Sequence, residues 1–125
     1  MPVDRKANLV VIVDDDESIQ DALQDLLESA GVPAKAFGSA EDFLASGLDR
    51  EAGCLISDVR MPRMSGLELQ ARLKADRCHL PIIFITAHGD ARTRLQAMRE
   101  GAVEFLSKPF DHQVLLGKVR AALEM

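Results

Sequence analysis

The strongest constraint on this chain is the recurrence of short apolar runs that end on polar, chemically reactive residues. The four runs, each with the residues that follow it, are Val10 to Val13 with Asp14, Asp15 and Asp16; Cys54 to Ile56 with Asp58; Ile82 to Ile85 with Thr86; and Val103 to Leu106 with Lys108. Short apolar runs separated by helical patterns indicate buried parallel strands. Because ligands bind beyond the carboxyl ends of the strands in open α/β sheets, we expect these polar side chains to converge in one crevice. Carboxylates with a hydroxyl and an ammonium suit a hard divalent cation together with a phosphoryl group.

Helical patterns fill the segments between these runs. The first pattern stops at Gly31 and places apolar residues at intervals of three and four, namely Ile19, Ala22, Leu23, Leu26, Leu27 and Ala30. A further strand is predicted over Val32 to Phe37. Ser39 then caps a short second helix that ends near Gly47, and residues 48–53 are expected to form a loop.

Three more helices are predicted in the second half of the chain. Ser65 and Glu68 form a capping-box pattern for a third helix that ends near Asp76. Gly101 closes a fourth helix and Asp111 caps a fifth. The apolar positions of these last two helices are Ala91, Leu95 and Met98 in the fourth, and Leu115, Val119, Ala122 and Leu123 in the fifth.

This order of elements predicts one α/β domain. A strand followed by a helix occurs five times, which with right-handed crossovers gives a doubly wound parallel sheet of order 2-1-3-4-5, flavodoxin-like in architecture. The 125 residues are enough for one well-covered core and too few for two ordinary domains, so residues 1–125 are expected to be a single domain.

Composition argues against several classes of function. The formal charge of -5 argues against direct binding of nucleic acid or an anionic membrane, because neutralising phosphates requires clustered Lys and Arg. Cys54 and Cys78 lack the partners of a disulfide framework or a zinc site. The apolar stretch from Leu9 to Val13 is too short for a signal peptide or a membrane span, so we expect a cytoplasmic protein.

Four motifs stand in order at the ends of the predicted strands. They are V-D-D-D-E at Val13 to Glu17, S-D-V-R-M-P-R-M-S-G at Ser57 to Gly66, F-I-T-A at Phe84 to Ala87, and K-P-F at Lys108 to Phe110. One motif alone would be weak, but the ordered set is specific. Across essentially the whole chain, these motifs resemble the receiver domains of two-component response regulators.

Further segments narrow this resemblance. S-A-E-D-F-L at Ser39 to Leu44, D-V-R-M-P at Asp58 to Pro62 and A-V-E-F-L-S-K-P-F at Ala102 to Phe110 are most similar to FixJ-type (LuxR-class) receivers. Such receivers usually precede a helix-turn-helix transcription domain, which these 125 residues do not include. The resemblance therefore favours a piece of a longer transcription regulator over a stand-alone or hybrid-kinase receiver.

The resemblance implies a phosphoacceptor site that depends on a metal. Asp58 would be the nucleophile that takes a phosphoryl group from a phosphohistidine on a sensor histidine kinase. Asp15 would be the principal carboxylate ligand of Mg²⁺, Asp14 its partner, partly through water, and the backbone carbonyl of Arg60 a further ligand beside Asp58. Mn²⁺ is a possible substitute. The chain would be a signalling domain that catalyses its own Asp phosphorylation and dephosphorylation. It would not be a metabolic enzyme.

The resemblance also implies a conformational switch. Thr86 would hydrogen-bond one phosphoryl oxygen and Lys108 would pair with another, so that both favour the phosphorylated state. Phe105 stands where family members carry a switching aromatic residue, but it has no hydroxyl, so its coupling would depend on packing. The Lys108–Pro109 peptide bond would be cis. His88 is expected to influence how water reaches the acyl phosphate.

The resemblance also implies a surface for contact with a second copy of the domain. A phosphorylation-dependent homodimer would use the region of the fourth helix and the fifth strand. The basic residues of the last two helices are either a solvated face or part of such a contact; they are Arg92, Arg94, Arg99, Lys118 and Arg120.

Other interpretations stay open from sequence alone. A phosphatase of the haloacid-dehalogenase type would use Asp14 as its nucleophile, but it would leave Asp58 without a role and normally needs a longer chain. A pseudo-receiver would act only as an interaction module and would normally lack one of the acidic or lysine positions. Asp16 and Glu17 suit a helix cap as well as a metal site, and Phe105 can be an ordinary core residue.

Overall fold

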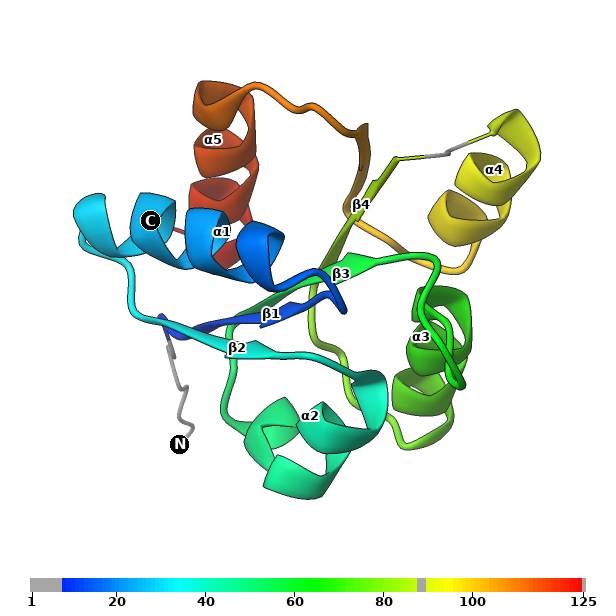
Figure 1. Cartoon of the computed structure of the whole chain (residues 1–125). Helices are drawn as coiled ribbons and strands as arrows, with labels where there is room; N and C mark the ends of the chain where they lie inside the picture. The colour runs from blue at the N-terminus through cyan, green and yellow to red at the C-terminus, as the bar shows by residue number, and fades with distance from the viewer. Residues whose placement is uncertain (1–7, 88–89, 125) are drawn as a thin grey trace.

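A five-stranded parallel sheet carries helices on both of its faces (Figure 1). In this computed structural model, residues 8–87 and 90–124 are described. The strands are β1 (Val10–Val13), β2 (Ala34–Phe37), β3 (Cys54–Asp58), β4 (Ile82–Thr86) and β5 (Glu104–Ser107). The helices are α1 (Glu17–Ser29), α2 (Ala40–Ser46), α3 (Gly66–Ala75), α4 (Ala91–Arg99) and α5 (His112–Leu123), with a short 3-10 helix at Leu48–Arg50.

The strand order β2-β1-β3-β4-β5 confirms the predicted doubly wound topology. All neighbouring strands pair in parallel, with Val13 opposite Ser57, Asp58 opposite Ile85 and Thr86 opposite Ser107. Since these registers align the carboxyl ends of the central strands, the residues that follow β1, β3, β4 and β5 meet at one edge.

Alternation along the buried strands divides the core into two layers. In β1, Val10 and Ile12 face the layer under α1 and α5, whereas Val11 and Val13 face the layer under α2, α3 and α4. Successive strand side chains point to opposite faces, so a strand covered on both sides is apolar throughout. This is the physical reason for the continuous apolar runs in the sequence.

The predicted helix caps are confirmed. Ser39 accepts a hydrogen bond from the Asp42 N–H, and Ser65 with Glu68 forms a complete capping box. Asp16 caps α1 and Asp111 caps α5. Each cap satisfies backbone donors that the first helical turn leaves unpaired.

Several predicted boundaries were wrong. β2 begins at Ala34 rather than Val32, because Gly31 adopts a left-handed conformation and the Val32 N–H closes the end of α1 on the Leu27 carbonyl. Residues 48–53 are not entirely loop, since Leu48–Arg50 form a 3-10 helix. β5 begins one residue later than predicted, and Val103 is exposed.

The predicted apolar face of the fourth helix was wrong at Ala91 and Leu95 and right at Met98, which is half-buried against the core. Leu95 is 58% exposed, and Ala91 is exposed as well. The buried residue of α4 is Ala97, which packs in the layer shared with α2 and α3. A short helix buries only a few residues against the sheet, and the packing of the whole fold decides which of its apolar residues these are.

Cys54 is buried and Cys78 is half-buried, and both are free thiols. Within residues 8–87 and 90–124, none of the helices is both long and apolar enough to cross a membrane. His88 lies outside the described residues.

Candidate functional site

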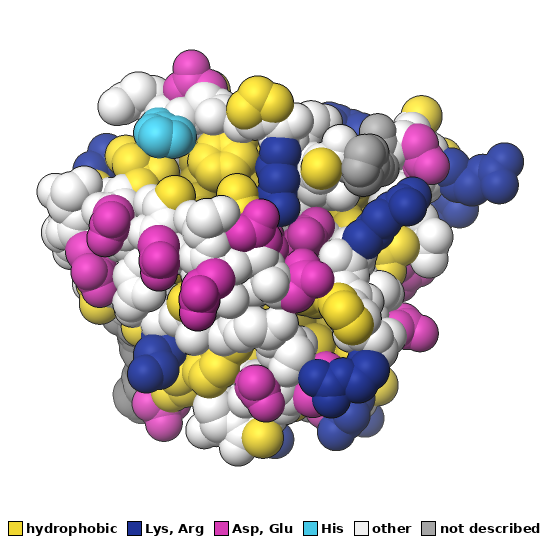
Figure 2. Space-filling view, viewed as in Figure 1, with side chains coloured by type: hydrophobic (Ala, Val, Ile, Leu, Met, Phe, Trp, Pro, Cys, Tyr) yellow, Lys and Arg dark blue, Asp and Glu magenta, His cyan; other side chains and the backbone are white. Residues whose placement is uncertain are grey.

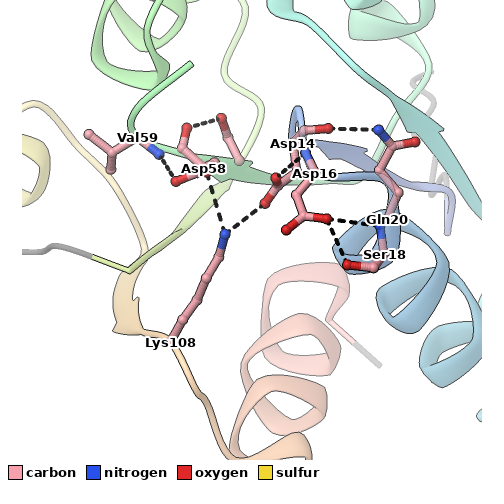
Figure 3. A network of polar contacts seen from close by, with 8 residues as sticks. Asp14, Asp16, Ser18, Gln20, Asp58, Val59 and Lys108 are labelled. Carbon is pink, nitrogen blue, oxygen red and sulfur yellow. Dashed lines mark hydrogen bonds and ion pairs between the residues drawn. The ribbon is translucent and has the colours of Figure 1, made fainter. Parts of the chain in front are cut away.

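Asp58 ends β3 at the centre of the carboxyl edge of the sheet. The residue is 8% exposed, so it is buried with a small part of its surface in contact with solvent. Oδ1 accepts a hydrogen bond from the Val59 N–H at 2.7 Å, and Oδ2 faces Lys108 (Figure 3). One oxygen is therefore fixed by the backbone while the other belongs to a charge cluster.

Asp14 and Asp15 follow β1, next to β3 in the sheet. Asp14 is fully buried and accepts the Asp16 N–H at 2.9 Å, while Asp15 is exposed. The Gln20 side chain of α1 donates to the Asp14 carbonyl oxygen at 2.7 Å (Figure 3). The loop after β1 is thus held by the Asp14 carboxylate, through the Asp16 N–H, and by Gln20 of α1.

Asp16 has a structural role instead. Its carboxylate accepts hydrogen bonds from the N–H and the hydroxyl of Ser18, at 2.9 and 2.7 Å. These bonds hold the pKa of the Asp16 carboxyl below its ordinary value. Asp16 is the N-cap of α1, in agreement with the capping interpretation of this residue.

Lys108 links the two acidic strand ends. Its Nζ lies 3.0 Å from Asp14 Oδ2 and 3.4 Å from Asp58 Oδ2 (Figure 3). Burial opposes the ammonium charge, but the hydrogen bond and charges of Asp14 and Asp58 outweigh burial and raise the pKa of Lys108. For Asp14, burial raises the pKa of the carboxyl despite its hydrogen bonds from Asp16 and Lys108. The lysine therefore stays cationic, and the acidic cluster is only partly compensated.

Thr86 ends β4 beside Asp58 and β5. It is 2% exposed, and its carbonyl oxygen accepts the Lys108 N–H at 2.8 Å. The peptide bond between Lys108 and Pro109 is cis, the isomer that the resemblance implies. The predicted residues from four strand ends are therefore neighbours in one region.

The carboxylates fit a hard divalent cation. One oxygen from each of Asp14, Asp15 and Asp58 lies within 4.8 Å of the other two. Oxygen donors at this spacing suit Mg²⁺, which usually keeps several waters of its own. Arg60 lies two residues beyond Asp58 with an exposed side chain, and the role of its carbonyl as a ligand remains a prediction.

Phe105 lies in β5, away from the carboxylates. It is buried, and its ring centroid lies 6.3 Å from that of Phe84. Its carbonyl oxygen accepts a hydrogen bond from Arg94 of α4 at 3.1 Å. Phe105 is thus a core residue in this state, and it joins β5 to α4.

Sequence reasoning missed three side chains that support the site. Gln20 holds the Asp14 backbone, Arg94 holds the Phe105 backbone, and Glu41 of α2 bonds to the loop after β3. Only Glu41 carried a signal, since it lies within the S-A-E-D-F-L segment. The contacts themselves connect separate elements, which no local pattern encodes.

The surface beside the site is acidic along α1. The exposed acidic residues of this helix are Glu17, Asp21, Asp25 and Glu28. In Figure 2 acidic side chains gather over this helix. The side of the site formed by α1 therefore repels anionic macromolecules.

Comparison with known proteins agrees with these features. The family model described as the response regulator receiver domain matches residues 10–120. The response regulator protein TodT of Pseudomonas putida is 45% identical over 120 residues, which are 96% of this chain and 53% of TodT. The transcriptional regulatory protein FixJ of Azorhizobium caulinodans is 43% identical over 114 residues, which are 91% of this chain and 54% of FixJ. The chain thus spans about half the length of these relatives.

The fold has close counterparts among solved structures. The crystal structure of FixJ-N superposes with a TM-score of 0.84 at 41% identity, covering 93% of both chains. This likeness therefore extends over nearly the whole α/β unit.

Proposed function

The chain belongs to the response regulator receiver domain family of two-component systems, and on that premise we propose that it is a phosphoacceptor switch. Asp58 takes a phosphoryl group from a phosphohistidine on a sensor histidine kinase. The observation that carries the proposal is the cluster of three carboxylates at one sheet edge, with Lys108 between two of them.

In the proposed transfer, a carboxylate oxygen of Asp58 attacks phosphorus. An O–P bond forms, the P–N bond to the histidine breaks, and its electron pair returns to the imidazole. Because phosphoryl transfer depends mainly on positioning and charge stabilisation, the protein needs fixed cationic and hydrogen-bonding groups around the oxygens. Lys108 supplies a cation 3.4 Å from Asp58, and the Val59 N–H fixes the carboxylate orientation.

Asp14, Asp15, Asp58 and the carbonyl of Arg60 would hold Mg²⁺, or Mn²⁺ in its place. The bound ion would neutralise part of the charge on the carboxylates and on the phosphoryl oxygens. The crowding of carboxylates supports this assignment, since Lys108 alone leaves the cluster with excess negative charge.

The proposed switch begins at Thr86 and Lys108. Their side chains bond two oxygens of the phosphorylated Asp58, and the carbonyl of Thr86 already accepts the Lys108 N–H. A shift of Thr86 would change the packing around Phe84 and Phe105, whose rings are in contact. Because Phe105 has no hydroxyl, this coupling acts through packing and through the bond from Arg94 to its carbonyl.

The partners follow from the same proposal. The sensor kinase docks at the site, and phosphorylation favours a homodimer through α4 and β5, with transcription as the controlled output. The acidic surface of α1 supports the absence of direct nucleic-acid binding by this domain. We expect these steps to take place in the cytoplasm.

The geometry does not favour the phosphatase alternative. Its nucleophile would be Asp14, which is fully buried, with one oxygen bonded to the Asp16 N–H and the other to Lys108. Asp58 also has one oxygen bonded to a backbone N–H and the other facing Lys108, so exposure is what separates the two carboxylates: Asp58 is 8% exposed and Asp14 is not exposed. Asp58 is the more accessible of the two.

Intact-mass measurement after incubation with acetyl phosphate tests the proposal, with and without Mg²⁺. We expect wild type to gain one phosphoryl group only with Mg²⁺, and Asp58→Asn to gain none. Asp14→Asn should react more slowly. An adduct or turnover that survives Asp58→Asn but requires Asp14 would favour the phosphatase, and no adduct on wild type would favour a pseudo-receiver.

A further inference from the structure

We propose that Glu41, on α2, is a positioning residue of the phosphoacceptor site. It holds the loop of residues 59–65 between β3 and α3, which continues directly from Asp58. This inference rests on the proposed function for its consequence, but the contact that carries it is independent of any bound ion. The S-A-E-D-F-L segment, which contains Glu41, has no other role in the site.

The contact joins segments that are distant in the chain. Oε2 of Glu41 accepts the backbone N–H of Met64 at 3.1 Å, across 23 residues of sequence. Oε1 lies 3.9 Å from a guanidinium nitrogen of Arg63. The carboxylate of α2 therefore faces two successive residues of the loop.

The Glu41 side chain is 35% exposed as a whole, but one of its carboxylate oxygens is shielded, so the contact is more than a surface ion pair. Oε1 of Glu41 is shielded from solvent and has no hydrogen-bond partner within residues 8–87 and 90–124. A shielded carboxylate oxygen without a hydrogen bond is unfavourable, so the side chain must be held in place by its other contacts. The hydrogen bond from the Met64 N–H is the main one of those contacts, since the Arg63 side chain is 69% exposed and exposed ion pairs contribute little.

The loop needs such support. Arg63 has a positive φ of 66°, a left-handed conformation that is uncommon for a residue other than glycine. The base of the loop is closed by the Gly66 N–H on the Val59 carbonyl at 2.8 Å, and its end by the capping box of Ser65. Glu41 bonds to Met64, between the two ends of the loop, and so ties the loop to the neighbouring α2.

Arg60 lies inside the loop that Glu41 restrains. Its carbonyl is the proposed backbone ligand, so release of Met64 would let that carbonyl and the chain beyond Asp58 move. Groups that orient metal ligands from outside typically change metal affinity by about 10- to 100-fold when they are lost. Because Glu41 acts through a loop, we expect the lower end of that range.

Four variants separate contact from charge. Glu41→Ala removes both, Glu41→Asp keeps the charge but shortens the side chain, and Glu41→Gln keeps an oxygen within reach of Met64 without the charge. Asp42→Ala is the matched control, because Asp42 occupies the same helical turn and is exposed.

Hydrogen exchange at the Met64 amide, measured without metal, reports the contact. Titration of Mg²⁺ followed by amide chemical shifts reports its consequence. Glu41→Ala and Glu41→Asp should each speed Met64 exchange and raise the Mg²⁺ dissociation constant about tenfold. Glu41→Gln and Asp42→Ala should stay close to wild type. At saturating Mg²⁺, the phosphorylation rate of Glu41→Asp should return to near wild type.

Other results would overturn the inference. An unchanged Mg²⁺ dissociation constant in folded Glu41→Asp would do so, and so would an equal rise in Asp42→Ala, which would indicate a general charge effect. If Glu41→Ala does not fold, Glu41→Asp still decides the question. Failure of wild type to take a phosphoryl group would instead refute the proposed function, since exchange and metal titration do not require phosphorylation.

Discussion

Replacing Asp14 by asparagine is expected to stabilise the metal-free protein at pH 7, although it removes a proposed metal ligand. Asp14 is fully buried, and burial with the charge of Asp58 raises the pKa of its carboxyl. An acid whose pKa is higher in the folded state destabilises the fold at any pH where both states are ionised. The amide removes that penalty and keeps an oxygen for the Asp16 N–H.

The magnitude follows from the distances. At an effective dielectric constant of about 20, the 3.0 Å contact with Lys108 favours the Asp14 charge by about 5.5 kcal/mol, and Asp58 within 4.8 Å opposes it by about 3.5 kcal/mol. The remaining attraction of about 2 kcal/mol is smaller than the several kcal/mol that desolvation of a buried ion costs. We therefore expect the free energy of unfolding to rise by about 1 to 2 kcal/mol.

Urea unfolding followed by circular dichroism measures this change, since the chain has neither Trp nor Tyr for fluorescence. In EDTA, the advantage of Asp14→Asn over wild type should be greatest at pH 7. It should shrink as the pH falls through the raised pKa of Asp14 towards the ordinary value of 3.8, because wild type then becomes protonated in the folded state.

Mg²⁺ should reverse the order of stability. A ligand at a hundred times its dissociation constant stabilises the folded state by about 2.7 kcal/mol, and wild type should bind more tightly than the variant. Asp21→Asn, at an exposed position of α1, is the control for loss of one negative charge. A variant that is less stable than wild type in EDTA at pH 7 would refute the reasoning, because the attraction to Lys108 would then exceed the cost of burial.

Three further predictions concern the glycines near and far from the site, the two thiols and Thr86. Gly66→Ala should lower the free energy of unfolding by about 1 to 3 kcal/mol, because its Cβ would overlap the carbonyl oxygen of Asp58. Gly117→Ala, in open space on α5, should raise it by about 0.5 to 1 kcal/mol, and equal changes in urea unfolding would contradict this. Iodoacetamide at pH 8 should modify Cys78 before Cys54, because burial raises the pKa of the Cys54 thiol to about 12, and peptide masses showing the reverse order would disprove it. Thr86→Ala should still accept a phosphoryl group by intact mass but lose the amide shifts that phosphorylation causes in α4 and β5; shifts equal to those of wild type would remove Thr86 from the switch.

Much of the fold was predictable because its signals are local. The apolar runs predicted the strands, since a strand covered by helices on both faces must be apolar along its length. Ser39, Ser65 and Asp111 predicted helix starts, since a cap acts within one turn. The ordered motifs predicted which strand ends carry the site.

The burial of individual residues depended on tertiary structure. Leu95 fits a helical stripe by spacing but is exposed, because α4 turns Ala97 and Met98 to the core instead. Asp14 and Asp15 are adjacent and chemically identical, yet one is buried and the other exposed. Their environments differ because the surrounding elements cover the chain after β1 at Asp14 and leave it open at Asp15, and the local sequence does not specify this.

The sequence by itself determined the order of strands and helices along the chain, the caps and the set of reactive residues, because each depends on periodicity or on chemistry within a few positions. Only the tertiary structure decided that Lys108 lies between Asp14 and Asp58, and that Glu41 holds Met64. These contacts join residues 94, 50 and 23 positions apart. Distances of that kind are set by how strands and helices pack together, and packing is a property of the whole fold.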